Sequence, residues 1–244
     1  MTGSFLAERL SHYVALTAAE NAALGRLEGQ PRALKRGTIL QQEHDRATDA
    51  YIVRQGWLHS YVLLDDGSRQ ILRLHLPGEL AGASGVAFVK ATESIAALTD
   101  VVICPFDKAA LSRTFVDHPR LAALIYLISQ AERVALTDRL ASLGRTSAKA
   151  RVAALLLDTL DRLRAMNPDL GPTIVFPLTQ EEIGDATGLT AVHVNRMMRV
   201  LVEEGLIARS GTSLCLLDEQ RLRRISNHVN RHADFDTSWL PPAS

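Results

Sequence analysis

Apolar positions recur with two different periods along the chain, and the change of period divides it. Over residues 4–29 leucines recur at helical spacing, and Thr17 with Glu20 has the spacing of a capping box, so a helix is predicted. From Pro31 on, short apolar segments alternate with turn residues. Strands are expected at 38–40, 51–53, 57–64, 70–76, 95–98 and 101–106, with a hairpin turn at Asp65-Asp66-Gly67. Many short strands favour a β-sandwich, barrel or roll over a parallel α/β sheet.

A long helix is predicted from Arg120 to about Leu143, after the opening Asp117-His118-Pro119. Its apolar residues cover more than one face, so we expect two apolar partners. One is the β-domain, and the other is the same helix of a second subunit; the alternative is a helix buried inside one domain. Residues 144–147 end the helix and mark a hinge. A further helix over 148–166, a strand at 174–177 and a last helix within 218–231 follow, and the tail from Ala233 is expected to be mobile or draped on the surface.

Residues 179–207 have the pattern of two short helices joined by a tight turn. Thr179 and Glu182 have capping-box spacing at the start of the first helix, and Gly188 supplies a backbone that can turn sharply. Thr190 is placed to cap the second helix. Four apolar residues of that helix recur at helical spacing and are expected to face the core: Val194, Met197, Leu201 and Val202.

The opposite face of the second helix carries no acidic residue before Glu203. Its stripe consists of Ala191, Val192, Asn195, Arg196 and Arg199, with His193 near the edge. Because Asn and Arg bond base edges in the major groove, this face predicts a DNA-reading helix. The alternative is an ordinary helical hairpin with a solvated face. A strand, a glycine turn and a second strand over 206–217 favour DNA binding, since such a wing commonly flanks a helix pair of this kind.

The composition fits a globular protein of one large or two ordinary domains, but it does not itself indicate nucleic acid. The net charge is zero over 244 residues, so any DNA affinity must come from a local patch. Cys104 and Cys215 lie in separate apolar runs without metal-type spacing, which indicates free thiols of a reducing compartment. There is no signal-peptide pattern and no apolar run of membrane-spanning length, so we expect a cytoplasmic protein without a membrane partner.

In this order the elements resemble the Crp/Fnr family of bacterial transcription regulators. The resemblance rests on Gly37, Gly56, Asp66-Gly67, Pro77-Gly78-Glu79-Leu80, residues 145–153, residues 178–184, Gly188-Leu189-Thr190 and Val194-Asn195-Arg196. It implies an α+β fold: an antiparallel, cyclic nucleotide-binding-like β-roll sensor over 1–118, a dimerisation helix over 119–144, a C-terminal winged helix-turn-helix over 145–232 and a tail over 233–244. It also implies a homodimer that binds a palindromic operator in double-stranded DNA and contacts or blocks RNA polymerase.

The resemblance also assigns DNA-binding positions. The family's base-reading positions fall on Ala191, Val192 and Arg196, and its phosphate contacts fall on Thr179, Gln180 and His193. With the stripe and the cap, the predicted set is Thr179, Gln180, Thr190, Ala191, Val192, His193, Asn195, Arg196 and Arg199. The best-known member has arginine and glutamate where this chain has Ala191 and Val192, so we expect a different half-site. Arg196 should take a guanine, and Val192 offers only apolar contact, as to a thymine methyl.

The sensor end departs further from the family pattern. Cyclic AMP-binding relatives hold the cyclic phosphate with an arginine and a serine, and alignment places Ala91 and Thr92 there. Lys90 lacks the planar fork that suits phosphate, which argues against cyclic AMP, although Glu79 is able to accept a ribose hydroxyl. The predicted effector pocket comprises Gly78, Glu79, Leu80, Lys90 and Thr92. Two distant cysteines cannot supply the roughly four thiolates of an iron–sulfur cluster, so no cofactor is assigned. A small-molecule effector and ligand-free regulation both stay open.

Two other classes of protein remain as alternatives. A cupin-like metal enzyme with a helical appendage would need converging histidines and a carboxylate, and His44, His59 and His75 lie in or beside the strands without ligand spacing. His75, beside Pro77, could suggest a haem ligand, but a histidine on a strand face of a β-roll more often has a structural role. A nucleotide-sensing module that does not bind DNA would leave the wing unexplained. We therefore expect no catalytic residue and no metal site.

Overall fold

The structure, a computed structural model, describes residues 3–233 and 235–243. Its chain divides between two compact units. Unit 1 comprises Met1–Gln130 together with Phe235–Ser244, and unit 2 comprises Ala131–Asp234. The boundary falls inside the long helix α4 (Pro119–Arg145), which covers the predicted helix and extends it by a residue or two at each end.

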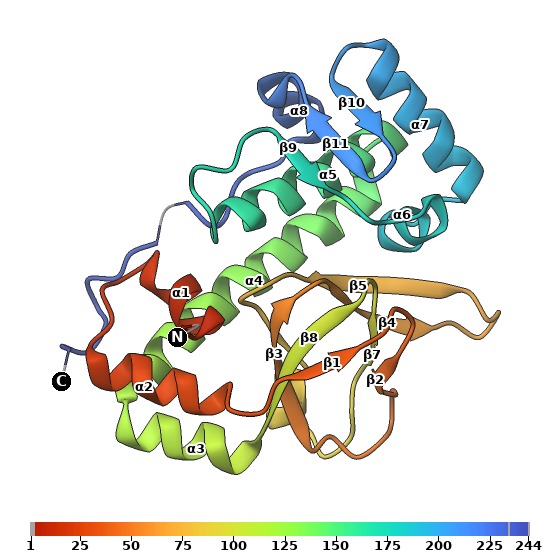
Figure 1. The fold of residues 1–244 in the computed structure, drawn as a ribbon. Coiled ribbons are helices and arrows are strands. Elements are labelled where there is room, and N and C mark those ends of the chain that lie inside the picture. The colour runs from red at the N-terminus through yellow and green to blue at the C-terminus, as the bar shows by residue number, and fades with distance from the viewer. Residues whose placement is uncertain (1–2, 234, 244) are drawn as a thin grey trace. The chain divides into compact units, whose positions relative to one another are not determined.

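Two antiparallel four-stranded sheets form a β-roll in unit 1 (Figure 1). The first has the order β1-β8-β3-β6, with β1 at Arg32–Leu34, β8 at Val101–Asp107, β3 at Asp49–Gln55 and β6 at Leu80–Ala81. The second has the order β2-β7-β4-β5, with β2 at Ile39–Gln41, β7 at Ser94–Ala97, β4 at Leu58–Leu63 and β5 at Arg69–His75. A core cluster that includes Val53, Leu58 and Ile95 joins the two sheets. The predicted antiparallel roll is confirmed.

Four helices pack on the first sheet of the roll. They are α1 (Phe5–Ser11), α2 (Ala18–Leu27), α3 (Lys108–Asp117) and the first part of α4. The predicted helical character of residues 4–29 is confirmed, and it takes the form of two helices, α1 and α2. The capping box explains the break: Thr17 Oγ1 accepts from the Glu20 N–H at 3.2 Å and the Glu20 carboxylate accepts from the Thr17 N–H at 2.8 Å, which starts a new helix.

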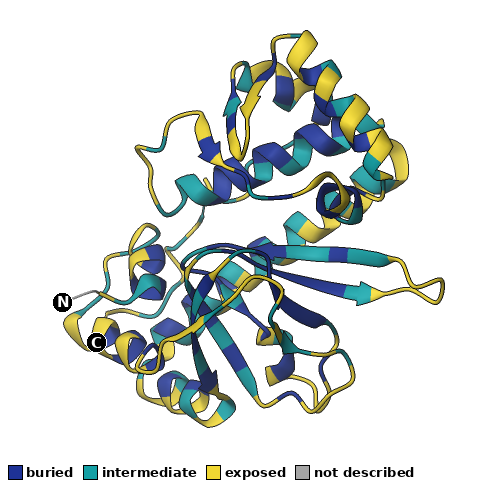
Figure 2. Cartoon of the chain, turned by 45° about the vertical axis from the view of Figure 1, so that its right-hand side comes forward, coloured by how far each residue is buried: buried dark blue, intermediate teal, exposed yellow. Residues whose placement is uncertain are grey.

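Unit 2 is built around α5 (Ala148–Arg164), which contacts three other helices. These are α6 (Gln180–Thr187), α7 (Ala191–Glu203) and α8 (Glu219–Ser226). A small antiparallel sheet has the order β10-β11-β9, from Ile207–Ser210, Ser213–Leu216 and Thr173–Val175. Apolar residues from α5, α6 and α7 lie buried between these elements (Figure 2). The predicted winged helix-turn-helix is confirmed, although the last helix stops at Ser226, where Asn227 takes a left-handed conformation.

A buried carboxylate joins α5 to α8 within unit 2. Asp161 accepts hydrogen bonds from both terminal nitrogens of Arg223 and lies 2.9 Å from Nε2 of His228. Burial alone would raise the pKa of Asp161, but hydrogen bonds from His228 and Arg223 and their charges outweigh it and hold the pKa below its usual value. A group whose pKa is lowered on folding stabilises the fold above its unfolded pKa, and this contribution is lost as pH falls.

Asp161→Asn should therefore lower the free energy of unfolding by about 3 kcal/mol near neutral pH, because it removes one partner of a buried ion pair. The loss should shrink as pH falls below about 4, where the wild-type carboxylate also takes up a proton. Guanidinium unfolding followed by circular dichroism measures it. Asp158→Asn, one turn away and half-buried, is the matched control and should cost about 0.5 kcal/mol. Equal losses in the two variants would contradict the assignment.

Candidate nucleic-acid interface and effector pocket

The first helix of the pair, α6, begins at the predicted capping box. The Glu182 N–H donates to Thr179 Oγ1 at 3.1 Å, and the Thr179 N–H donates to Glu182 Oε2 at 2.7 Å. These two bonds satisfy donors that a helix start otherwise leaves unpaired. Thr179 and Gln180 are both exposed at this helix start, so their polar groups are open to a ligand.

The turn between α6 and α7 depends on two glycines. Gly188 ends α6 with φ +66°, a conformation that disfavours side chains. Gly184, within α6, lies so close to the carbonyl oxygen of Leu189 that an added Cβ would collide with it. A side chain at Gly184 would therefore displace the turn before α7, and one at Gly188 would strain the backbone.

Two arginines donate to the carbonyl end of α6 and support the turn. Arg151 of α5 donates from Nη1 to the Thr187 carbonyl oxygen at 2.9 Å, and Arg139 of α4 donates from Nη2 to that of Ala186. Cations at a helix C-terminus are favourable because unpaired carbonyls there carry partial negative charge. The contact of Arg139 could not be predicted from sequence spacing, because Arg139 lies 47 residues from its acceptor.

The second helix, α7, starts at Thr190, whose hydroxyl accepts from the His193 N–H at 3.3 Å. Its buried face consists of Val194, Met198 and Leu201. The prediction that Met197 and Val202 face the core is wrong: Met197 is half-buried and Val202 is exposed. The buried line follows spacings of four and three residues, which places Met198 below Val194 and turns Val202 toward solvent.

The opposite face of α7 carries the predicted DNA-binding residues. Val192 is 79% exposed, and Asn195, Arg196 and Arg199 are exposed beside it. His193 is also exposed, with its Nδ1 3.2 Å from the Thr190 hydroxyl, while Ala191 is half-buried. In the part of the chain that the structure describes, no acidic side chain forms an ion pair with Arg196 or Arg199. This face therefore combines an apolar contact, an amide and two available guanidinium groups.

The wing is attached to the helix pair by Arg209 of β10. Its Nε donates to the Gly211 carbonyl oxygen at 3.2 Å, and its Nη2 donates to that of Leu178 at 3.3 Å. Leu178 lies directly before the cap of α6. The wing turn therefore has a fixed place next to the start of α6, a contact that sequence spacing did not predict.

Among the predicted effector residues, Glu79 is engaged with side chains of the roll and of α1. Glu79 is buried and its carboxylate already has three partners: Arg9 Nη1 at 3.1 Å, Arg73 Nη2 at 3.4 Å and the Leu76 N–H at 3.2 Å. Arg9, on α1, is itself only 2% exposed. Two guanidinium groups therefore already neutralise the carboxylate that was expected to accept a ribose hydroxyl.

The other predicted effector residues offer little for an anion. Ala91 is buried, and Thr92 donates from its hydroxyl to Ser84 on the surface at 3.2 Å. Lys90 is exposed and pairs through its backbone with Arg46 in an isolated bridge. Gly78 has φ +79° in the turn before Glu79, and Leu80 starts β6. No phosphate-binding fork is formed by these residues.

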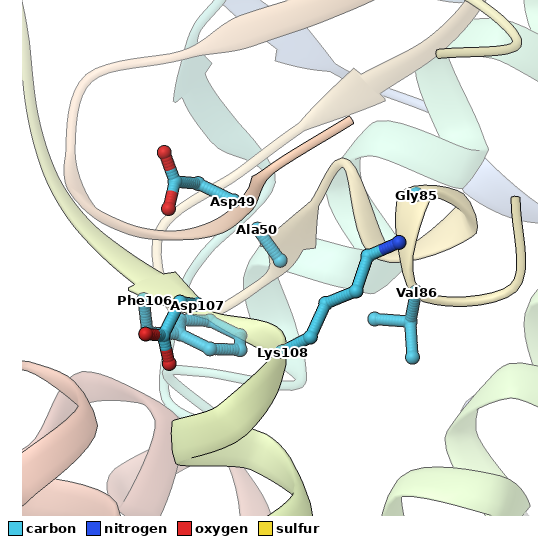
Figure 3. A pocket seen from close by; sticks show the side chains of 7 residues that line it. All are labelled: Asp49, Ala50, Gly85, Val86, Phe106, Asp107 and Lys108. Carbon is cyan, nitrogen blue, oxygen red and sulfur yellow. The ribbon is translucent and has the colours of Figure 1, made fainter. Parts of the chain in front are cut away.

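A shallow surface depression lies on unit 1 (Figure 3). Its lining residues are Asp49, Ala50, Gly85, Val86, Phe106, Asp107 and Lys108, and none of the predicted effector residues is among them. Its charged groups have partners, since Asp107 caps α3 and Lys108 Nζ donates to the Phe88 carbonyl oxygen at 3.0 Å.

The histidines raised by the metal-enzyme alternative do not form a ligand set. His44 is exposed with φ +71°, whereas His59 and His75 are buried in β4 and β5. Within residues 3–233 and 235–243, no three His, Cys, Asp or Glu side chains are grouped to hold a metal. Across the same residues, no helix is both long and apolar enough to span a bilayer.

Comparison with known proteins matches both units. Residues 31–118 match the cyclic nucleotide-binding domain, and residues 150–225 match the Crp-like helix-turn-helix domain. The nitrogen fixation regulation protein FixK of Bradyrhizobium diazoefficiens is 33% identical over 190 residues, covering 78% of this chain and 79% of the relative. The chain belongs to the Crp/Fnr family.

Other relatives of this Crp/Fnr protein agree in fold and length. The transcriptional activatory protein AadR of Rhodopseudomonas palustris is 31% identical over 183 residues, covering 75% of each chain. The solved structure of FixK2 from Bradyrhizobium japonicum superposes with a TM-score of 0.72 at 27% identity, covering 80% of this chain and 96% of that one. This chain is accordingly a DNA-binding transcription regulator of the Crp/Fnr family. These relatives are named as a regulation protein and a transcriptional activatory protein, neither of which is an enzyme name.

The buried Arg9–Glu79 pair gives a stability test within this regulator. Arg9→Met should lower the free energy of unfolding of unit 1 by about 3 kcal/mol, because Glu79 would lose one of two cationic partners. The double variant Arg9→Met, Glu79→Gln should recover part of that loss, because no uncompensated carboxylate remains. Both tryptophans, Trp57 and Trp239, belong to unit 1, so tryptophan fluorescence during urea unfolding reports on this unit. Additive losses in the double variant would contradict direct coupling of the pair.

Proposed function

We propose that this Crp/Fnr regulator binds a palindromic operator as a homodimer and reads one guanine in each half-site through Arg196. The observation that carries the proposal is the exposed face of α7, where Arg196 lies beside an amide and an exposed valine. A bidentate arginine–guanine contact is worth about 1–3 kcal/mol of discrimination against other bases. Val192 can contact a thymine methyl but cannot hydrogen-bond a base, so we expect a half-site that differs from the cyclic AMP receptor consensus.

We propose that α4 pairs with its copy in the homodimer. One stripe of α4 has the alternating intervals of four and three residues that are typical of a coiled-coil seam. It consists of Ala122, Tyr126, Ser129, Arg133, Leu136, Leu140 and Leu143. This set is called the α4 seam below. It lies away from the buried residues Leu121, Leu124 and Leu127, and Leu140 is 72% exposed. Large apolar side chains exposed to water at this spacing support the pairing of α4 with a second helix.

We propose further that the roll does not take a cyclic nucleotide. The support is the donor set itself: Glu79 is paired with Arg9 and Arg73, and Ala91 and Thr92 supply no fork for a phosphate. If another effector binds, it would act by favouring the dimer whose recognition helices lie about 34 Å apart, one DNA turn. The proposed place of action is the cytoplasm, where operator and RNA polymerase would be the partners.

Selection of bound sequences from random DNA tests the readout. The wild-type protein should return a palindrome with guanine in each half-site. Arg196→Ala should lose the preference at that position, by about 10- to 100-fold in affinity ratio, while remaining dimeric and folded. Arg113→Ala, an exposed arginine of α3 in unit 1, is the matched control and should leave the selected sequence unchanged. An unaltered consensus from the Arg196 variant, or selection of the cyclic AMP receptor site, would reject this assignment.

Arg199→Ala should behave differently from Arg196→Ala. If Arg199 contacts phosphate, the variant should bind all sequences more weakly and the slope of log affinity against log salt should fall by about one unit. Fluorescence anisotropy on specific and random duplexes from low to high salt measures both quantities. A change of preferred base with an unchanged slope would show that Arg199 reads a base instead.

Titration calorimetry with cyclic AMP and cyclic GMP tests the proposal that the roll does not bind a cyclic nucleotide. We expect no binding heat at millimolar nucleotide and no change in operator affinity. The double variant Arg9→Met, Glu79→Gln removes the buried ion pair and so tests whether that pair alone prevents nucleotide binding. We expect this variant also to show no binding, because the chain has no guanidinium fork for the phosphate. Saturable binding by the wild-type protein would overturn this part of the proposal without affecting DNA recognition.

A further inference from the structure

The C-terminal tail is fixed on unit 1, although the chain that precedes it belongs to unit 2. Phe235 packs edge-on against Tyr13, with ring centroids 4.8 Å apart. Leu240 packs against the cluster formed by α1, α2 and the first sheet. Between them Asp236 accepts from the backbone and hydroxyl of Ser238 at 2.9 and 2.6 Å. The tail is therefore held on both sides of Trp239.

Trp239 itself is left half in water. Its ring lies edge-on to Tyr126 of α4, with centroids 6.5 Å apart, and it is 51% exposed. Tyr126 is 59% exposed with Trp239 in place. Two neighbouring aromatic rings thus remain open to solvent on a segment that is otherwise anchored. Exposed aromatic groups of this kind are typical of surfaces that bind another protein.

Tyr126 connects this aromatic pair to the α4 seam. It is the second residue of the seam and precedes Leu136 and Leu140, which lie about 15 and 21 Å further along the helix. Trp239 therefore lies beside the N-terminal end of the α4 seam, in contact with its second residue. Side chains that flank a coiled-coil seam exclude water from it. An anchored tryptophan beside Tyr126 is therefore placed to pack against the partner helix and to exclude water from the seam.

We infer that the tail is part of the homodimer interface, with Trp239 packing against the α4 of a second copy of this chain. The inference rests on the proposed pairing of α4 and adds the residues that extend it. The opposite arrangement, a tail that covers the seam and prevents pairing, fits the exposure less well. Tyr126 stays 59% exposed with the tail in place.

Sedimentation equilibrium of the full chain tests the inference. Trp239→Ala should raise the dimer dissociation constant on the order of tenfold, as expected for loss of an aromatic anchor at an interface. Phe88→Ala is the matched control, because Phe88 is a 55% exposed aromatic residue of unit 1 in the segment between β6 and β7; it should leave the constant unchanged. An unchanged constant for Trp239→Ala would overturn the inference, and a lower constant would show that the tail opposes pairing.

Two further measurements keep the outcome interpretable. Leu140→Ala should also weaken the dimer; if it does not, the proposed α4 seam fails, whatever Trp239 does. In Trp57→Phe, Trp239 is the remaining tryptophan of the two, so its emission can be followed on dilution. A red shift at the dimer dissociation midpoint supports burial of Trp239 at the interface, and a constant wavelength contradicts it even if the alanine variant misfolds.

Discussion

The approach of Gly184 to the carbonyl oxygen of Leu189 fixes the geometry on which DNA reading depends. A recognition helix presents its side chains to base edges only if its angle to the preceding helix is constant. The close approach sets that angle, and Gly188 then turns the chain without strain. Arg151 and Arg139 hold the carbonyl end of α6 from two other helices. The placement of α7 therefore depends on groups that lie outside its own exposed face.

Buried carboxylates organise unit 1 in a comparable way. Glu28, at the end of α2, accepts from Ser4 and from the backbone N–H groups of Phe5 and Leu6, so it caps α1 across a distance of more than twenty residues. Glu20 pairs with Arg120 of α4, and Glu79 pairs with Arg9 of α1. Each of these carboxylates would be costly to bury alone. Together they attach the N-terminal helices to the roll and to α4.

Sequence reasoning succeeded where the interactions are local. Both capping boxes join residues three apart, and the strands and α7 show their period directly, so these features could be predicted. It failed where a partner lies far along the chain, as for Arg9 and Glu79 or Arg139 and Ala186. It also missed β1 and β6, which are too short to show a period, and α3, which follows β8 without a break. The predicted DNA-binding residues could be placed on one face because a single helix carries most of them.

The α4 seam combines apolar and polar positions, and this mixture bears on how the dimer would be specified. Leu136, Leu140 and Leu143 supply apolar area in the second half, whereas Ser129 and Arg133 occupy its middle. Polar residues at seam positions lower stability but restrict register and partner number. When polar residues weaken the middle of a seam, contacts added at its ends contribute a larger share of the stability of the dimer. An aromatic anchor beside Tyr126 would supply such a contact, which gives a physical reason for a C-terminal tail held on unit 1.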